Sequence, residues 1–158
     1  MTPAEEKYVH HVSCIDDLNR AWSILQELRR ASERTAVHAA AFAFALIEYA
    51  KPYTRSDGVY KQGRHGYALP PPDLEPEELA LHHQILNLRR QALAHSDLTF
   101  KEATVYRDAR GGVSRPGVIS NVPPPLPDCD AVIRLIERTL DRMYADRVRM
   151  EGSLTYLA

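Results

Sequence analysis

Four stretches of this chain place apolar residues at helical spacing, and this periodicity constrains the fold more than any other feature of the sequence. Apolar residues that recur every three or four positions predict amphipathic helices, here over residues 15–31, 33–50, 77–95 and 128–150. Pro52 ends the second helix, and Pro76 favours the first turn of the third. The pattern therefore predicts an all-α fold, an antiparallel bundle of four to five helices in a single domain covering residues 1–158.

Three of these helices carry expectations about packing. Helix 33–50 is nearly apolar all round over residues 39–47, which predicts a central position in the bundle. Helix 77–95 has two apolar stripes on nearly opposite sides. One stripe comprises Leu79, Leu86 and Leu93, and the other comprises Leu81, Ile85, Leu88 and Ala92. Such a helix is either central or shared with a second subunit, so we expect a homodimer through helix 77–95. The last helix has an expected buried face of Val132, Leu135, Ile136, Leu140, Met143 and Tyr144.

The segments outside these helices carry weaker signals. Residues 99–106 alternate in a β-like way, Gly111 and Gly112 can form a turn, and residues 113–122 can return as a second strand. We therefore expect a small β-hairpin over 99–122, before the last helix. The charged N-terminal segment that holds His10 and His11 is expected to be mobile and is assigned no role.

The composition excludes some classes of function. Hydrophobic residues make up 44% and charged residues 26% of the 158 residues, which is typical of a globular protein. Because 20 basic residues oppose 21 acidic ones, binding to a polyanion needs a local patch. The longest apolar run, 39–47, is too short to span a bilayer, and the N-terminus lacks a leader pattern. We expect a cytoplasmic protein without a membrane partner.

The most basic part of the chain is the long connection over residues 51–76. Before Pro70, this connection contains several basic residues but only one acidic residue, Asp57. Four of them are candidate substrate-binding residues for phosphate groups: Lys51, Arg55, Lys61 and Arg64. A second basic stripe, Arg134, Arg138 and Arg142 at i, i+4 spacing, either follows a phosphate backbone or forms a solvated, salt-bridged face.

Residues 88–97 combine the side chains that can act on a phosphodiester without a metal. Arginine binds phosphate through a planar, permanently charged fork, and histidine can move a proton near neutral pH. On a continuous helix, His95 lies about 140° from Arg90 and about 120° from Arg89, so a joint site needs an irregular helix end or two copies of the chain. The alternative is that the arginines form surface ion pairs and His95 is a polar helix end.

The sequence Leu88-Arg89-Arg90-Gln91-Ala92-Leu93-Ala94-His95-Ser96-Asp97 resembles the signature of the HEPN superfamily. Its ending is similar to that of the subgroup related to abortive-infection proteins. That subgroup also carries an aromatic-basic-proline segment after its preceding helix, which Tyr49-Ala50-Lys51-Pro52-Tyr53-Thr54 resembles. By this resemblance His95 matches the family histidine, and Arg89 matches the arginine at a six-residue offset. Arg90 matches the arginine at the shorter spacing, and otherwise stands where asparagine or aspartate is usual.

The resemblance implies a metal-independent RNA endonuclease of a toxin or phage-defence system, or an RNA- or nucleotide-binding relative. It implies a homodimer, because the motifs of two subunits meet in active members, and a cognate antitoxin is a possible partner. No cofactor or metal is expected. The histidine would take a proton from the ribose 2′-hydroxyl, and an imidazolium would protonate the leaving 5′-oxygen, which is typically worth ~10²–10⁴-fold. Arg89 or Arg90 would hold the phosphate.

Two further candidate substrate-binding residues, His82 and Asp97, and one rival function stay open. His82 shares a helix face with Arg89 at i, i+7 and with Glu78 at i−4, so it either orients Arg89 or belongs to a surface network. Asp97 is either a turn residue or orients the His95 imidazole. The rival function is a non-catalytic helical dimerisation or interaction module with a vestigial motif. The near-neutral charge favours this module, whereas the intact arginine and histidine favour the nuclease.

Overall fold

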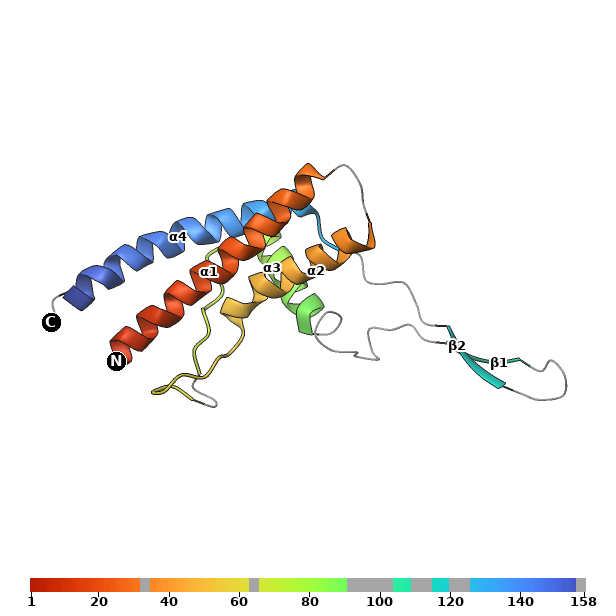
Figure 1. Cartoon of the computed structure of the whole chain (residues 1–158), viewed down its shortest axis with the longest axis horizontal. Coiled ribbons are helices and arrows are strands. Elements are labelled where there is room, and N and C mark those ends of the chain that lie inside the picture. Colours follow the sequence, from red (N-terminus) through yellow and green to blue (C-terminus); the bar gives the residue numbers. More distant parts are fainter. Residues whose placement is uncertain (32–34, 63–65, 91–103, 109–114, 120–125, 156–158) are drawn as a thin grey trace.

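The computed structural model describes residues 1–31, 35–62, 66–90, 104–108, 115–119 and 126–155. This part is mostly helical, as the sequence predicts. Its helices are α1 (Pro3–Arg30), α2 (Ala36–Ala50), the short 3-10 helix η1 (Lys51–Tyr53), α3 (Pro76–Leu88) and α4 (Cys129–Thr155). Figure 1 shows α4 running antiparallel beside α1, while α2 packs on α1 and α3 contacts both α2 and α4.

Helix α1 begins at Pro3, so the expectation of a mobile N-terminal segment was wrong. Thr2 and Glu5 form a capping box, in which each side chain accepts a hydrogen bond from the other residue's backbone N–H. The buried face of these first turns includes Glu6 and His11. Because that face is partly polar, apolar periodicity did not detect the helix before residue 15.

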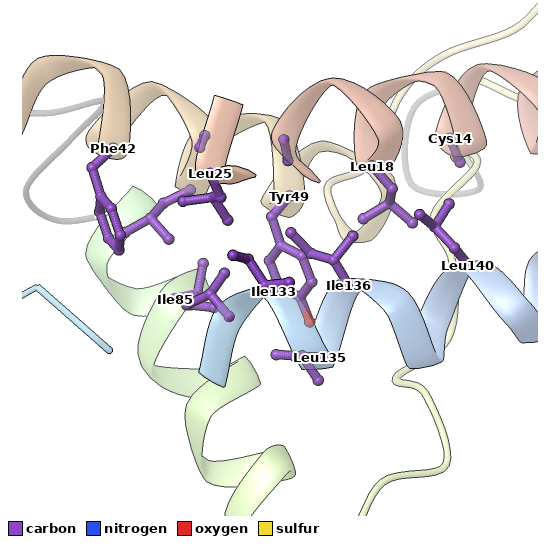
Figure 2. Packing of buried hydrophobic residues seen from close by; sticks show 14 of the residues in the cluster. Cys14, Leu18, Leu25, Phe42, Tyr49, Ile85, Ile133, Leu135, Ile136 and Leu140 are labelled. Atoms are coloured by element: carbon purple, nitrogen blue, oxygen red, sulfur yellow. The ribbon is translucent and has the colours of Figure 1, made fainter. Parts of the chain in front are cut away.

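The core lies where α1, α2, α3 and α4 meet around Tyr49 (Figure 2). Tyr49 itself is fully buried. The predicted inner face of α4 is buried at every position except Tyr144, which is 43% exposed and whose hydroxyl accepts a hydrogen bond from Asn19 at 2.8 Å. The central residues of the core are Leu18, Leu25, Leu46, Ile85, Leu135 and Ile136.

Helix α2 does not occupy the central position that its composition predicts. Phe42 and Leu46 face the core, whereas Val37 is 75% exposed and Phe44 is 45% exposed. Helix α2 is apolar on all its faces but is not buried on all of them. Helix α1 covers one side of α2, and no described element covers Val37 or Phe44.

The remaining fold predictions concern the β-hairpin and the two apolar stripes of α3. Strands β1 (Thr104–Asp108) and β2 (Arg115–Ile119) pair antiparallel, with Thr104 opposite Ile119 and Asp108 opposite Arg115. The hairpin predicted over 99–122 includes residues outside the described part, so as a whole it stays a prediction. Within α3, Ile85 and Leu88 are buried, while Leu79 and Leu86 of the other stripe are only half-buried.

Candidate functional site

The candidate catalytic residues are divided between described and undescribed parts of the chain. Arg89 and Arg90 lie at the C-terminal end of α3, with Arg89 as its C-cap residue. His95 and Asp97, like Arg64 of the basic connection, lie outside the described residues. The position of His95 relative to the two arginines therefore stays a prediction from the sequence.

The two arginines differ in their surroundings. Arg89 is half-buried, and its Nε is buried without a hydrogen-bond acceptor among the residues that the structure describes. Arg90 is exposed, and its Nη2 donates to Oδ1 of Asn87 at 3.4 Å, one turn back in the same helix. A buried donor that lacks an acceptor carries a desolvation cost of about 1–3 kcal/mol, which an anionic ligand can offset. Of the two arginines, Arg89 thus has the stronger tendency to bind an anion.

His82, expected as a substrate-binding residue beside Arg89, is 1% exposed in the core. Its Nδ1 shares a hydrogen bond of 2.8 Å with the hydroxyl of Tyr49, and the Tyr53 ring meets it edge-on at 4.5 Å between centroids. Burial, with a smaller contribution from His83, lowers the pKa of His82 to about 4, so the ring is neutral. This is a correction, because a ring enclosed in this way joins η1 to α3 and is not accessible from the surface.

The expected network of Glu78 with His82 is also replaced by another contact. The Glu78 carboxylate accepts a hydrogen bond from Arg138 of α4 at 2.5 Å, which lowers the pKa of Glu78. Arg138 therefore belongs to a salt-bridged face, one of the two interpretations of the α4 stripe. This ion pair fixes the start of α3 against α4.

Lys51, expected to bind phosphate, forms ion pairs within the protein. Its Nζ lies 2.5 Å from Glu48 and 3.5 Å from Asp17. The Glu48 carboxylate is almost completely buried, and Arg20 lies 3.3 Å from its other oxygen. A buried carboxylate needs a paired cation, so the charge of Lys51 compensates Glu48. Lys51 therefore has a structural role in the described part of the chain, and its phosphate-binding role stays a prediction.

Arg55 and Lys61 are exposed, as a phosphate-binding role requires. Figure 1 shows their segment beside the N-terminal end of α1, away from the C-terminal end of α3. The Lys61 ammonium lies 5.0 Å from the centroid of the Tyr67 ring. The segment is fastened to α1 through Glu6, whose carboxylate accepts hydrogen bonds from the backbone of Val59 and Tyr60. Sequence reasoning missed Glu6, because nothing local distinguishes it from a surface acid of a first helical turn.

A small cavity of about 120 Å³ lies between α1, η1 and α4. Pro70, Pro71 and Pro72 form one wall, and Arg142 stands among the α4 residues. The cavity also borders His11, whose Nε2 donates to the Met143 carbonyl at 2.9 Å. This space is large enough for a few water molecules or one very small solute.

Three general properties of the chain bear on the site. Within the described residues, no three or more His, Cys, Asp or Glu side chains are grouped so that they could hold a metal ion. No helix in the same ranges has the length and apolar character to cross a membrane. Comparisons with protein-family models, curated proteins and solved structures gave no match.

Proposed function

We propose that this chain is a HEPN-type, metal-independent RNA endonuclease, or an RNA- or nucleotide-binding relative of one, in a toxin or phage-defence setting. The observation that carries the proposal is the state of Arg89, which is half-buried at the end of α3 and whose Nε has no hydrogen-bond acceptor among the described residues. In a sequence that resembles the HEPN motif, this is the arginine at the six-residue offset from His95. Arg90, which contacts Asn87, is the weaker candidate for the motif arginine.

A second observation supports the proposal. The resemblance depends on two separate segments, residues 49–54 and 88–97. The first of them packs on α3 through the Tyr49–His82 hydrogen bond and the Tyr53–His82 ring contact. Those contacts fix the helix that presents Arg89 relative to η1. A fixed helix is what a catalytic arginine needs, because misplacement of a charged donor reduces its effect on the transition state.

The chemistry follows from the side chains. The Arg89 guanidinium would bind the scissile phosphate and stabilise its developing negative charge. His95 would act on the 2′-hydroxyl as a base, and the imidazolium of a second subunit would protonate the 5′-oxygen. The products would be a 2′,3′-cyclic phosphate and a 5′-hydroxyl. DNA would not be cut, because it has no 2′-hydroxyl.

The experiment is cleavage of single-stranded RNA by the purified protein in EDTA. We expect His95→Ala to abolish cleavage without loss of the fold as judged by circular dichroism. Arg89→Lys should reduce the rate on the order of 10²–10³-fold, because lysine keeps the charge but loses the planar fork. Arg90→Lys is the matched control and should have a smaller effect, since Arg90 is exposed and next to Asn87. A larger loss for Arg90→Lys would assign the motif to the shorter spacing.

The second candidate function is the non-catalytic interaction module, which the exposed apolar side chains of Val37 and Phe44 favour. Val37 and Phe44 lie about two helical turns apart on the same face of α2, so they can form an apolar docking surface. Binding of RNA without cleavage across a broad panel of sequences would favour a binding relative of the nuclease. Absence of both binding and cleavage would favour the interaction module.

A further inference from the structure

Three hydrogen-bond donors converge on one carboxylate at the N-terminal end of α1. Glu6 is buried, at 6% exposure. Its carboxylate accepts hydrogen bonds from the backbone N–H of Val59, from the backbone N–H of Tyr60 at 3.0 Å and from the Tyr67 hydroxyl at 3.1 Å. These donors, the two N–H groups and the Tyr67 hydroxyl, are called the anion cradle below.

The anion cradle is held in place by contacts that do not involve that carboxylate. Ser56 and Tyr67 form an antiparallel bridge with backbone hydrogen bonds of 2.8 and 2.7 Å. The Gly58 N–H donates to the carbonyl of Lys61 at 2.7 Å, which closes a tight turn. The Tyr67 ring stacks on His10 with 5.0 Å between centroids. The three donors are therefore pre-organised, and removal of the carboxylate should leave them in position.

The local chemistry suits an anion. Consecutive backbone N–H groups in a turn form concavities that bind anions, and Gly58 lets one approach closely, because a Cβ there would collide with the Glu6 carboxylate. Lys61 and Arg55 are exposed in the same segment, with Asp57 as the acidic neighbour. Burial works to raise the pKa of Glu6, but the hydrogen bonds from Tyr60, Val59 and Tyr67 outweigh it, so that the pKa lies below its usual value.

We propose that the anion cradle is a binding site for a phosphate group and that Glu6 occupies it as an internal competitor. Carboxylate and phosphate oxygens accept hydrogen bonds from the same N–H and hydroxyl donors, and both are negatively charged. A phosphate enters by displacing Glu6. The phosphate belongs either to a free ion or mononucleotide or to an RNA chain. The site does not depend on the proposed nuclease function, because its donors lie away from Arg89.

The test compares Glu6→Ala with the wild type and with Glu5→Ala, using inorganic phosphate as the probe. Glu5 is the matched control, because it lies next to Glu6 and contacts Thr2 instead of the anion cradle. We expect millimolar phosphate to raise the Tm of Glu6→Ala by several degrees more than that of either other protein at equal ionic strength. Amide NMR signals of Val59 and Tyr60 should shift with phosphate in Glu6→Ala, and Tyr67→Phe added to it should weaken the response.

Equal responses in the three proteins, with unshifted amides of Val59 and Tyr60, would overturn the proposal. If Glu6→Ala does not fold, Glu6→Gln, which keeps the size and removes the charge, takes its place with the same amide readout. Glu6→Gln also separates the two sources of phosphate. Tighter binding of single-stranded RNA by Glu6→Gln would assign the site to RNA. Unchanged RNA binding with phosphate-dependent amide shifts would assign it to a free phosphate or mononucleotide.

Discussion

At the scale of single residues, charge pairing decides which basic side chains remain available for a ligand. Lys51 and Arg55 belong to the same basic connection in the sequence. Of these two, Lys51 is ion-paired, whereas Arg55 is exposed and has no ion pair among the described residues. Lys51 instead compensates Glu48, a fully buried carboxylate of α2. The two residues can therefore be separated by their effects on stability.

We expect Lys51→Ala to lower the free energy of unfolding by about 1–3 kcal/mol. The loss stays below that of a fully buried pair, because Arg20 still contacts Glu48 at 3.3 Å. Arg55→Ala is the control and should change stability by less than about 0.5 kcal/mol, since the side chain is exposed. Urea unfolding of both variants measures the difference, and equal losses would contradict the role assigned to Lys51.

The buried His82 predicts a pH dependence of stability. Its pKa is lowered to about 4 by burial and His83, whereas in the unfolded chain it has the ordinary value near 6.5. The unfolded state therefore binds a proton first as the pH falls. The stabilisation is complete above pH 6.5 and is lost between pH 6.5 and about 4, with a slope of up to about 1.4 kcal/mol per pH unit.

The measurement for His82 is the free energy of unfolding in urea at several pH values. His82→Gln should show a smaller slope over that pH window than the wild type, because it lacks the titrating ring. His10 also has a pKa lowered by burial, but it is present in both proteins, so its contribution cancels in the comparison. Identical slopes for the two proteins would show that His82 is protonated to the same extent in the folded and unfolded states.

At the scale of helices, the sequence predicted where apolar faces exist but not which of them are covered. The spacing of Val132, Leu135, Ile136 and Leu140 identified the inner face of α4, because their burial follows from periodicity alone. Periodicity did not reveal the first turns of α1, whose inner face carries Glu6 and His11. The capping pair Thr2 and Glu5 was the available signal for that helix start.

The candidate site shows the same division between local and long-range information. The Arg89–His95 spacing is local and was visible in the sequence. The ion pair of Lys51 with Glu48 and the enclosure of His82 by Tyr49 and η1 are tertiary contacts, so no local pattern could predict them. The hydrogen bonds of Glu6 with the backbone of Val59 and Tyr60 join residues more than fifty positions apart, so no local pattern could predict them either.

Helix α2 provides a direct test of covered and uncovered apolar positions. Phe42 and Phe44 are two residues apart in one helix, yet Phe42 is 9% exposed and Phe44 is 45% exposed. Phe42→Ala should cost about 3–5 kcal/mol, because it opens a cavity in the core. Phe44→Ala should cost much less in a monomer. Urea unfolding gives both values, and a large concentration-dependent loss for Phe44→Ala would mean that a second copy covers this side of α2.

At the scale of the whole molecule, the proposed nuclease predicts a site that combines Arg89 and His95 of two chains, called the composite site below. The described part of α3 buries Ile85 and Leu88 within one subunit and leaves Leu79 and Leu86 half-buried. The homodimer predicted through residues 77–95 would cover Leu79 and Leu86. Because Arg89 follows Leu86 by one turn, a contact between two α3 helices would bring two Arg89 side chains toward one interface.

We therefore predict a dimer of about twice the 17.9 kDa chain mass by light scattering at micromolar concentration. Leu79→Glu and Leu86→Glu together should shift the protein to monomers, because they place two charges in an apolar contact. Val148→Glu is the matched control, since it adds the same charge at an exposed apolar position of α4. If RNA cleavage needs both subunits, the monomeric double variant should lose it while its helical content by circular dichroism is kept. A monomer that cleaves RNA at the wild-type rate would exclude the composite site, and it would leave Arg89 and His95 of a single chain as the complete machinery.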